Sequence, residues 1–405
     1  MTIALFSDSY LPTKSGIVTV VVQLQEQLKK MGHRVILVTV ETTDEYETYD
    51  PDIYRTRSVA LGLGTDQFLS IPAMHPLISY LKKNKVDIIH CHTEFMIGIT
   101  GIQAAKKMHI PLVATMHTMW DDYYRFYLPA GKIIPVSFIR KLTSLFYNRF
   151  YAVAGVSTKA YNHLKSKISP RANAVVIPNA MDASKFSSSV VSEDEKKQMR
   201  QKLGLNDDDF ICLFVGRLGE EKRIIELINA AGNAVLKNKS IKLLFIGDGP
   251  AMIQCKETVE QKGIKDNVIF TGFLEWKELH SYYSIANLFM TASLSEMHSM
   301  TILEALISGL PIVARDDQSF YDTIHHDENG YLAANDDEMT DYILKLANDR
   351  DLGEQFSKKS LEISNDYTPE LFTERYLALY NYVLSHKKKE INESELREII
   401  TSIGR

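Results

Sequence analysis

The sequence has 405 residues, of which 45% are hydrophobic and 24% are charged, and its formal net charge is −5. These values exclude a disordered chain, and the length suits two α/β domains better than a single core. Three cysteines, Cys91, Cys212 and Cys255, are too few and too scattered for a disulfide framework or a Cys-x-x-Cys metal site, so we expect them to be buried.

The first residues, MTIALFSDSY, lack the basic region and the apolar stretch of a secretory signal. No later segment reaches the roughly 18 apolar residues that cross a bilayer. We therefore expect a cytoplasmic protein, associated at most peripherally with the inner face of the plasma membrane.

Strand and helix patterns alternate from the start. Residues 4–8 predict a buried strand, a turn follows at 12–16, and residues 17–28 carry apolar side chains at helical spacing. Further buried strands are expected at 33–40, 86–92 and 110–117, with helices between them. This alternation predicts a parallel sheet.

Charge is divided unevenly along the chain. Residues 1–180 hold 20 Lys and Arg against 13 Asp and Glu, whereas the remainder holds 26 against 38. Residues 123–181 contain no acid and nine basic residues: Arg125, Lys132, Arg140, Lys141, Arg149, Lys159, Lys165, Lys167 and Arg171. Such a segment favours an anionic partner, either a phospholipid surface or a nucleic acid, and a solvated basic face is the alternative.

Within this segment, PVSFIRKLTSLFYNRFY predicts an amphipathic helix. Apolar Phe138, Leu142, Leu145 and Phe146 lie beside basic Arg140, Lys141 and Arg149. A helix of this kind suits an anionic lipid interface, and packing on a sheet is the other interpretation. The segment contains no recognisable nucleic-acid-reading module, so we expect no nucleic-acid partner.

A second cycle of strands is expected at 210–218, 241–249, 267–273, 286–293 and 310–317. The serine cluster and charge run between residues 176 and 197 are typical of a linker and a polar helix start. We therefore predict an N-terminal domain over residues 1–190 and a C-terminal domain over 191–370. Residues 371–405 form a C-terminal helix and a charged tail, to which we assign no chemistry.

Two glutamates, Glu296 and Glu304, lie eight residues apart in SLSEMHSMTILEA, where a strand end passes through a loop into a helix. Ser299 or Thr301 would lie near the helix N-terminus, where free N–H groups and the helix dipole favour a phosphate. Glu304 would accept hydrogen bonds from vicinal ribose hydroxyls, and Glu296 would face a sugar. A solvated helix surface explains the same spacing equally well.

Arg217 and Lys222 follow a buried strand in GRLGEEKR. Two cations at this spacing suit a diphosphate leaving group, whose growing charge they would stabilise, although a surface cation pair has the same appearance. Both constellations follow the carboxyl ends of strands, which is where ligands bind in open α/β sheets. This shared location favours a site.

The motifs GRL with EK, GDGP and the two spaced glutamates, together with SDSYLPTKSGI, DIIHCHTE, ATMHT, GVSTKA and VIPNAMD, resemble the family 4 retaining glycosyltransferases of the GT-B fold. The resemblance covers nearly the whole chain. It implies an α/β protein with two facing Rossmann-like domains, parallel sheets and an interdomain cleft. It also implies a hexosyltransferase that needs no cofactor and no metal.

The resemblance also implies roles for individual residues. Arg217 and Lys222 would hold the diphosphate, Glu304 the ribose, and Leu274 the base through its main chain. Gly16 would allow close approach to the phosphates, and His117 would hydrogen-bond the sugar near the acceptor. The donor sugar would lie against Glu296 and the backbone of the following residues, Met297, His298, Ser299 and Met300. The catalytic set would then be His117, Glu296, Arg217 and Lys222, with no enzymatic nucleophile.

His90 and His92 share a strand face, and a metal site is a further interpretation of this HCH sequence. We discount it because no third and fourth ligand is evident.

Three positions depart from the family pattern. Ser15-Gly16 replaces Gly-Gly, Ala180 replaces the Gly of PNG, and Ser299 replaces the Gly of the glutamate loop. The segments SGI, MHTMWDDYYRFY and SEMHSMTILEA resemble the branch that transfers glucose, from UDP-glucose, to diacylglycerol in bacterial membranes. The partners implied are a UDP-sugar, diacylglycerol or a related lipid, and an anionic membrane surface; helix residues Phe138, Arg140, Lys141, Leu142 and Arg149 would meet the lipid.

Three other functions remain compatible with parts of this pattern. A transferase with a soluble sugar or polysaccharide acceptor would carry the same donor motifs. A non-catalytic GT-B partner subunit would be expected to lose Arg217, Lys222 or the glutamates, and all of these are present. A nucleotide-sugar epimerase would be active without any acceptor.

Overall fold

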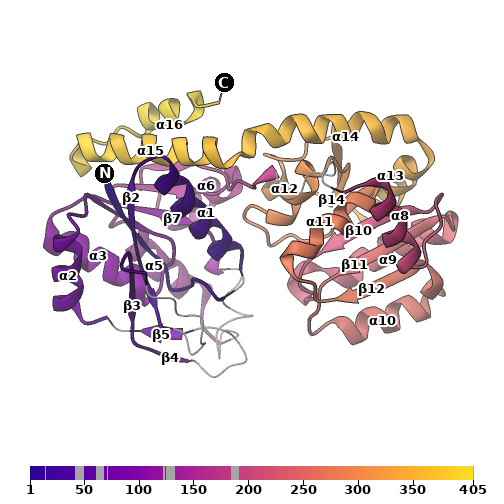
Figure 1. Ribbon diagram of the computed structural model, residues 1–405, viewed down its shortest axis with the longest axis horizontal. Helices are drawn as coiled ribbons and strands as arrows, with labels where there is room; N and C mark the ends of the chain where they lie inside the picture. The colour runs from indigo at the N-terminus through magenta and orange to yellow at the C-terminus, as the bar shows by residue number, and fades with distance from the viewer. Residues whose placement is uncertain are drawn as a thin grey trace. The chain divides into compact units, whose positions relative to one another are not determined.

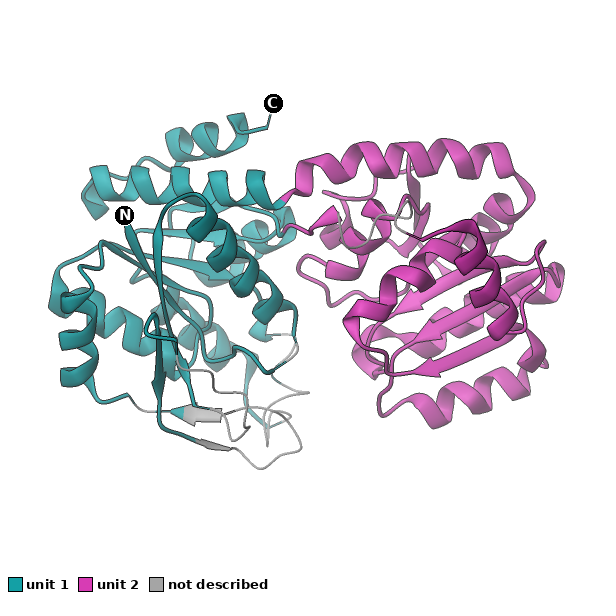
Figure 2. Ribbon diagram, viewed as in Figure 1, with its two compact units in different colours: residues 1–179, 369–405 teal, residues 180–368 magenta. Residues whose placement is uncertain are grey.

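A computed structural model describes residues 1–13, 15–41, 50–60, 68–70, 72–121, 124, 133–183 and 191–404. The chain divides into two compact units (Figure 2): residues 1–179 with 369–405, and residues 180–368. From the sequence alone we predict this boundary at 190/191, with residues 371–405 set apart. The second unit begins earlier because Met181 is buried in its core and donates a backbone hydrogen bond to Tyr367.

Seven parallel strands form the sheet of the first unit, in the order β3-β2-β1-β6-β7-β8-β9 (Figure 1). Their bounds are β1 (Thr2–Phe6), β2 (Arg34–Val40), β3 (Ile53–Thr56), β6 (Ile88–Cys91), β7 (Leu112–Met116), β8 (Ala152–Gly155) and β9 (Ala174–Val176). An antiparallel pair, β4 (Ser58–Ala60) and β5 (Phe68–Ser70), stands apart from this sheet. The central strands are buried along their length, as a parallel sheet covered on both faces requires.

Helices connect these strands. They are α1 (Gly16–Lys30), α2 (Met74–Lys83), α3 (Met96–Met108), α5 (Val136–Tyr147) and α6 (Thr158–His163), followed at the end of the chain by α15 (Pro369–Ser385) and α16 (Glu393–Ser402). The first of them begins where Ser15, in extended conformation, accepts a hydrogen bond from the Val18 amide. Val21, Leu24 and Leu28 then turn one face of α1 into the core.

The second unit has a six-stranded parallel sheet in the order β12-β11-β10-β13-β14-β15 (Figure 1). Its strands are β10 (Phe210–Val215), β11 (Ile241–Ile246), β12 (Val268–Gly272), β13 (Leu288–Thr291), β14 (Ile312–Arg315) and β15 (Gly330–Ala333). Successive residues of β10 enter different core clusters: Cys212 and Phe214 enter one, and Leu213 and Val215 the other. This alternation places an apolar layer on each face of the sheet.

The helices of this unit are α8 (Glu193–Lys202), α9 (Ile224–Lys237), α10 (Met252–Gln261), α11 (Trp276–Ile285), α12 (Met300–Ile307), α13 (Asp336–Asn348) and α14 (Arg350–Ser364). The charge run seen in the sequence starts α8, where Ser192 and Glu195 form a reciprocal capping box.

Each sheet has one point at which the strand order reverses. In the first unit, β1 lies between β2 and β6, and in the second, β10 lies between β11 and β13. Loops after β1 and β6, and after β10 and β13, therefore diverge to opposite faces of their sheets. This divergence opens the crevice in which ligands of doubly wound folds bind.

The end of the chain belongs to the first unit. Helix α15 packs on α1, and α16 packs on the edge strand β9. Phe372, Tyr376 and Tyr380, spaced four residues apart, form the buried face of α15. Within the described ranges, no helix is long and apolar enough to cross a membrane.

Candidate functional site

The strongest candidate site lies at the strand-order reversal of the second unit. Lys222, in the loop after β10, places Nζ 2.5 Å from Oε1 of Glu296, in the loop after β13. A second link joins the same loops, because the Ser295 hydroxyl donates to the Glu221 carbonyl at 3.0 Å. The cation and the carboxylate that the sequence analysis selected separately are thus direct neighbours.

The GDGP motif supports the loop after β10, which carries Arg217 and Lys222. The Leu218 amide donates to the Asp248 carbonyl, and the Ala251 amide donates to the Leu218 carbonyl. A Cβ atom at Gly249 would lie 2.4 Å from the Leu218 carbonyl oxygen, and one at Gly247 would lie 2.0 Å from that of Gly216. The glycines are therefore required by the close approach of two backbones.

Arg217 lies on the same loop, with its side chain 52% exposed. Its guanidinium is 3.3 Å from the carboxylate of Glu221, whose side chain is 7% exposed. Glu221 therefore restrains Arg217 without covering it, and the guanidinium remains accessible to an anion.

Helix α12 begins at Met300, directly after the Glu296 loop. Its first residue is preceded by Ser299, whose hydroxyl contacts Thr301 Oγ1 at 3.0 Å and makes no hydrogen bond to the N-terminal amides of the helix. Met297 and His298 are only 5% and 6% exposed, and burial lowers the pKa of His298 to about 4. Since these two side chains face the interior, a ligand bound at this loop would meet chiefly its main chain.

Glu304 lies in α12 and is only 4% exposed. The Tyr283 hydroxyl donates to its Oε2 at 2.7 Å, and the Trp276 side chain donates a further hydrogen bond. Burial raises the pKa of Glu304 to about 7, although both hydrogen bonds favour the charged form. The carboxyl is thus oriented by two partners, which the glutamate spacing alone did not indicate.

Leu274 follows β12 and packs its side chain against the core of the second unit. Its neighbours Phe273 and Trp276 are 62% and 41% exposed. These aromatic rings flank the position that the sequence analysis assigned to the base, and it did not select them. The signal was present as two large aromatic residues in a turn, a common means of binding the flat face of a base.

At the reversal of the first unit, Asp8 joins the loops after β1 and β6. Its carboxylate accepts hydrogen bonds from Thr93 Oγ1 at 2.5 Å and from the Ile97 amide at 2.9 Å. Gly16, the first residue of α1, is exposed at the same edge of the sheet, beside the capping residue Ser15.

His117 follows β7, and its Nε2 lies 3.1 Å from Nδ1 of His92. Burial lowers the pKa of His117 to about 3. The ring nitrogens of His90 instead contact the hydroxyls of Tyr380 and Thr115, each at 2.7 Å. Among the described residues, no group of three or more His, Cys, Asp or Glu side chains could hold a metal ion.

Glu94 is an acid at this edge that the sequence analysis passed over. It accepts hydrogen bonds from the Tyr147 hydroxyl and from Trp120 Nε1. Burial raises its pKa to about 7. Because Tyr147 lies on α5, Glu94 ties that helix to the strand ends.

Helix α5 has the apolar face that the sequence predicts. Phe138, Leu142 and Leu145 are 52%, 48% and 52% exposed and follow one another at helical spacing. Phe146 was expected on this stripe, and that expectation was wrong, because it is 7% exposed and packs its ring on Phe150.

The basic residues in and beside α5 have different surroundings. Arg140 Nε lies 2.9 Å from Asp121, whereas Lys141 is exposed on the helix surface. Arg149, which was expected on this helix, lies beyond its last residue Tyr147, and its carbonyl accepts a hydrogen bond from Lys388. Arg125 and Lys132 lie outside the described residues.

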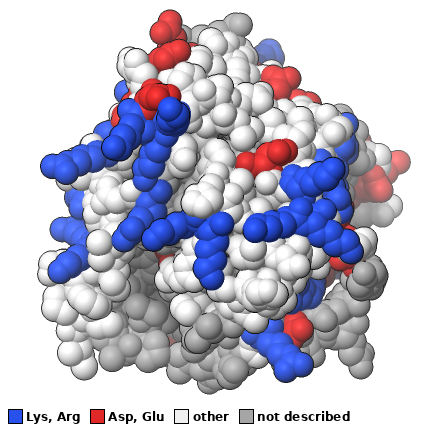
Figure 3. Space-filling model, turned by 90° about the vertical axis from the view of Figure 1, so that its left-hand side faces the viewer, with Lys and Arg blue, Asp and Glu red and all other residues white. Residues whose placement is uncertain are grey.

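One end of the first unit is strongly basic. Figure 3 shows many Lys and Arg side chains and few Asp and Glu on this surface. Helices α2 and α3, which lie at this end in Figure 1, finish in Lys82, Lys83, Lys106 and Lys107. A basic surface of this kind is one that an anionic partner would meet.

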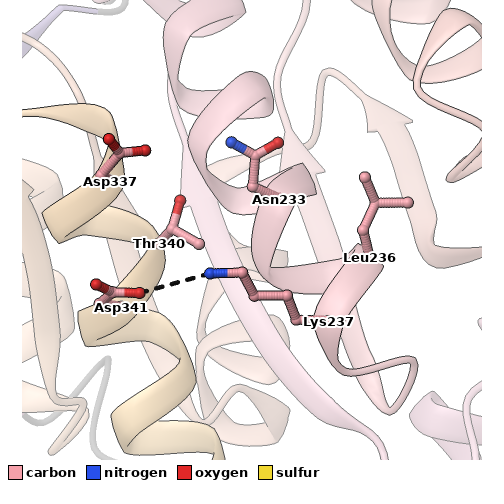
Figure 4. Close-up of a pocket in the computed structure, with 6 residues that line it drawn as sticks. All are labelled: Asn233, Leu236, Lys237, Asp337, Thr340 and Asp341. Carbon is pink, nitrogen blue, oxygen red and sulfur yellow. Dashed lines mark ion pairs between the residues drawn. The ribbon is translucent and has the colours of Figure 1, made fainter.

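A pocket of about 410 Å³ lies between α9 and α13 of the second unit (Figure 4). Leu236 and five polar residues line it, and among these Lys237 forms an ion pair with Asp341 at 3.7 Å. It lies near the C-terminal end of α9, away from the loops that carry Lys222 and Glu296. None of the residues selected from the sequence lines it.

Comparison with known proteins shows two family matches that together span most of the chain. The family model described as Glycosyltransferase Family 4 matches residues 14–185, and that described as glycosyl transferases group 1 matches residues 195–362.

Two curated relatives are both alpha-monoglucosyldiacylglycerol synthases. The protein of Streptococcus pneumoniae is 31% identical over 381 residues, which are 93% of this chain and 86% of the relative. The protein of Acholeplasma laidlawii is 27% identical over 398 residues, which are 97% of this chain and all of the relative.

Solved structures show the same fold at low sequence identity. A sucrose-phosphate synthase of Thermosynechococcus elongatus has a TM-score of 0.76 at 20% identity and covers 95% of this chain and 99% of its own. HepE of Anabaena, in complex with UDP and glucose, has a TM-score of 0.73 at 16% identity. The match covers 94% of this chain and 99% of the HepE chain.

Proposed function

Because this chain belongs to the group 1 and family 4 glycosyltransferases and has the GT-B fold, we propose that it transfers glucose from UDP-glucose to diacylglycerol, with retention at the anomeric carbon. The observation that carries the donor half of the proposal is the contact between Lys222 and Glu296 at the strand-order reversal of the second unit. A cation, a carboxylate and a helix N-terminus at one crevice are what a nucleotide sugar requires.

Each donor group has a partner in this arrangement. Lys222 and Arg217 bind the diphosphate, and the N-terminus of α12 supplies backbone N–H groups. Glu296 accepts hydrogen bonds from sugar hydroxyls, and Glu304 accepts them from the ribose. Phe273 and Trp276 are the exposed aromatic surface for the base.

The reaction needs no nucleophile from the protein. The bond between the anomeric carbon and the diphosphate oxygen breaks, and its electron pair stays on that oxygen. The acceptor hydroxyl oxygen bonds to the same face of the sugar, and its proton passes to the departing phosphate oxygen. Lys222, Arg217 and the α12 N-terminus lower the barrier by stabilising the negative charge that develops on the diphosphate.

The lipid half of the proposal rests on the first unit and on the relatives. Two relatives that match nearly the whole chain, at 31% and 27% identity, are named for a glucosyldiacylglycerol product. The exposed stripe of Phe138, Leu142 and Leu145 suits the boundary between headgroups and acyl chains, and the basic end of the unit suits anionic lipid (Figure 3). We propose that the protein is peripherally associated with the membrane in which its acceptor resides.

The direct test is transfer of radiolabelled glucose from UDP-glucose to diacylglycerol in vesicles that contain anionic lipid. We expect an α-glucosyl lipid, without added metal. Release of UDP only with a soluble acceptor would retain the donor site and overturn the lipid acceptor. A labelled product of β configuration would overturn retention, and no transfer with any nucleotide sugar would favour a non-catalytic subunit.

A further inference from the structure

Three histidines of the first unit form a chain at the ends of β6 and β7. Both nitrogens of His90 contact hydroxyl groups, Nδ1 that of Tyr380 and Nε2 that of Thr115. The His92 ring lies against it, with centroids 4.0 Å apart, and His92 Nδ1 lies 3.1 Å from His117 Nε2. His90 and His92 are completely buried, whereas His117 is partly exposed.

The contact between His92 and His117 fixes where the protons are. Burial lowers the pKa of both residues, that of His117 to about 3, so at neutral pH each ring is uncharged and carries one N–H. One ring must therefore donate to the other. The hydrogen bond exists in two forms, which differ in the nitrogen of His92 that bears the proton.

The surroundings of His92 decide between these forms. Its Nε2 is buried and has no hydrogen-bond partner among the described residues. If His117 donated, the only proton of His92 would be on this Nε2, and a buried N–H would be left without an acceptor. Buried N–H groups without acceptors are rare because the desolvated donor gains nothing in exchange. The favoured form has the His92 proton on Nδ1, donated to His117.

We propose that His92 is a positioning residue that donates from Nδ1 to His117 Nε2 and thereby holds His117 in the tautomer whose proton is on Nδ1. His117 then offers a hydrogen-bond donor, and no acceptor, to an oxygen of the substrate. It does not remove the proton of the acceptor hydroxyl, since the nitrogen that would take this proton is already occupied by His92. The role of His117 toward substrate rests on the proposed function, whereas its tautomer does not.

The tautomer is measurable without any substrate. Long-range ¹H–¹⁵N correlation spectra of the full-length protein, labelled with ¹⁵N-histidine, report which imidazole nitrogen is protonated, and His117→Asn assigns the signal. We expect His117 to be protonated at Nδ1. We expect His92→Leu, which removes the donor, to shift His117 toward the Nε2–H form, and His92→Asn, whose amide nitrogen replaces Nδ1, to retain the native form. An Nε2–H form in the native protein, or no change in His92→Leu, would overturn the proposal.

Measurements of sugar transfer then show whether His92 positions His117 or has only a structural role. Thr115→Val is the matched control, because it breaks the buried hydrogen bonds of Thr115 to His90 and to Tyr376 and leaves the pair of His92 and His117 intact. We expect kcat/KM for sugar transfer to fall roughly tenfold in His92→Leu, the value of one neutral hydrogen bond, and to change much less in Thr115→Val and His92→Asn. Equal losses in His92→Leu and Thr115→Val would make His92 structural. If the native protein transfers no sugar, the proposed function fails, and the spectra still decide the tautomer.

Discussion

Lys222 Nζ lies 2.5 Å from Glu296 Oε1, and the two side chains are 22% and 18% exposed. The charges of the two loops therefore neutralise each other before a donor arrives. A diphosphate must compete with Glu296 for Lys222, and Glu296 is then available to sugar hydroxyls. The ion pair thus holds both groups in place, and on donor binding Lys222 exchanges Glu296 for the diphosphate.

The first prediction concerns this pair. We expect Lys222→Ala and Glu296→Ala each to lower kcat at least about a hundredfold, because each removes a charged group that acts on the reacting bond. The free energy of unfolding should change by only about 1 kcal/mol, since partly exposed ion pairs contribute little. Steady-state kinetics and thermal unfolding check both expectations.

Lys237→Ala is the matched control, because it removes the Lys237–Asp341 ion pair in the pocket of Figure 4. It should leave kcat unchanged. Full activity in either Lys222→Ala or Glu296→Ala would show that the loops after β10 and β13 are not the donor site.

The second prediction is a pH dependence of donor binding. Burial raises the pKa of Glu304 from its ordinary value of 4.5 to about 7, and ribose hydroxyls require the charged form as acceptor. Affinity for UDP-glucose should therefore rise about tenfold between pH 6 and pH 8, as the ionised fraction does. Calorimetry at both pH values measures this rise. In Glu304→Gln the affinity should be lower and independent of pH over this range; a rise of the same size would assign the titration to another group.

The raised pKa of Glu304 also makes the stability of the fold depend on pH. The folded pKa of Glu304 lies above the unfolded one, so between about pH 4.5 and 7 the native state keeps a proton that the unfolded chain has released. This carboxyl therefore favours the folded state most at acidic pH, and its contribution declines as pH rises to about 7. Denaturant unfolding at pH 5 and pH 7.5 measures this contribution. The free energy of unfolding should fall less between these pH values in Glu304→Gln than in the native protein.

Much of this site was predictable because it depends on local patterns. Short apolar runs separated by helical segments predicted most of the central strands. The charged motifs follow the carboxyl ends of these strands, where the chain must leave the sheet. Contacts between distant segments were not predictable: the bonds of Tyr283 and Trp276 to Glu304 carry no periodic signal. Short strands such as β9 and β15, of three and four residues, have too little pattern to be recognised.

The orientation of α5 shows the same limit. The sequence predicts an amphipathic helix, but the helix has two apolar sides, one packed on the unit and one exposed. Phe146 belongs to the first and Leu145 to the second, although they are adjacent. Only the tertiary partners of the helix determine which side is which.

The third prediction tests the exposed side of α5. Replacing Phe138, Leu142 and Leu145 together by Ser should lower binding to anionic vesicles at least about tenfold, because each removes apolar surface that would enter the lipid. The fold should be retained, since all three side chains are about half exposed. Vesicle co-sedimentation measures the effect.

Ile253→Ser is the control for this experiment, because Ile253 is 73% exposed in the second unit. Its vesicle binding should equal that of the native protein. If the triple variant binds as tightly as this control, the stripe does not meet lipid.

Lys141→Glu is a cleaner charge variant than the reversal of Arg140. A glutamate at position 140 would face Asp121, and the ion pair there would become a repulsion between carboxylates. We expect Lys141→Glu to weaken vesicle binding at low salt, with the difference from native disappearing at high salt, where exposed charges are screened. Arg140→Glu should instead lower the melting temperature, and weaker vesicle binding by that variant would not be specific.

The last prediction concerns the charged tail, to which no chemistry is assigned from the sequence. Leu396 and Ile400, four residues apart on α16, are 0% and 1% exposed, and α16 packs on β9, the edge strand of the first sheet. Leu396→Ala and Ile400→Ala should each lower the free energy of unfolding by about 2–4 kcal/mol, through lost burial and the cavity left behind. Ile399→Ala, on the same helix but 36% exposed, should cost less than about 1 kcal/mol. Denaturant unfolding measures all three.

Removal of residues 386–405 should also promote aggregation, because an uncovered edge strand pairs with other chains. A truncated protein as stable and soluble as the native one would show that α16 is not part of the folded unit.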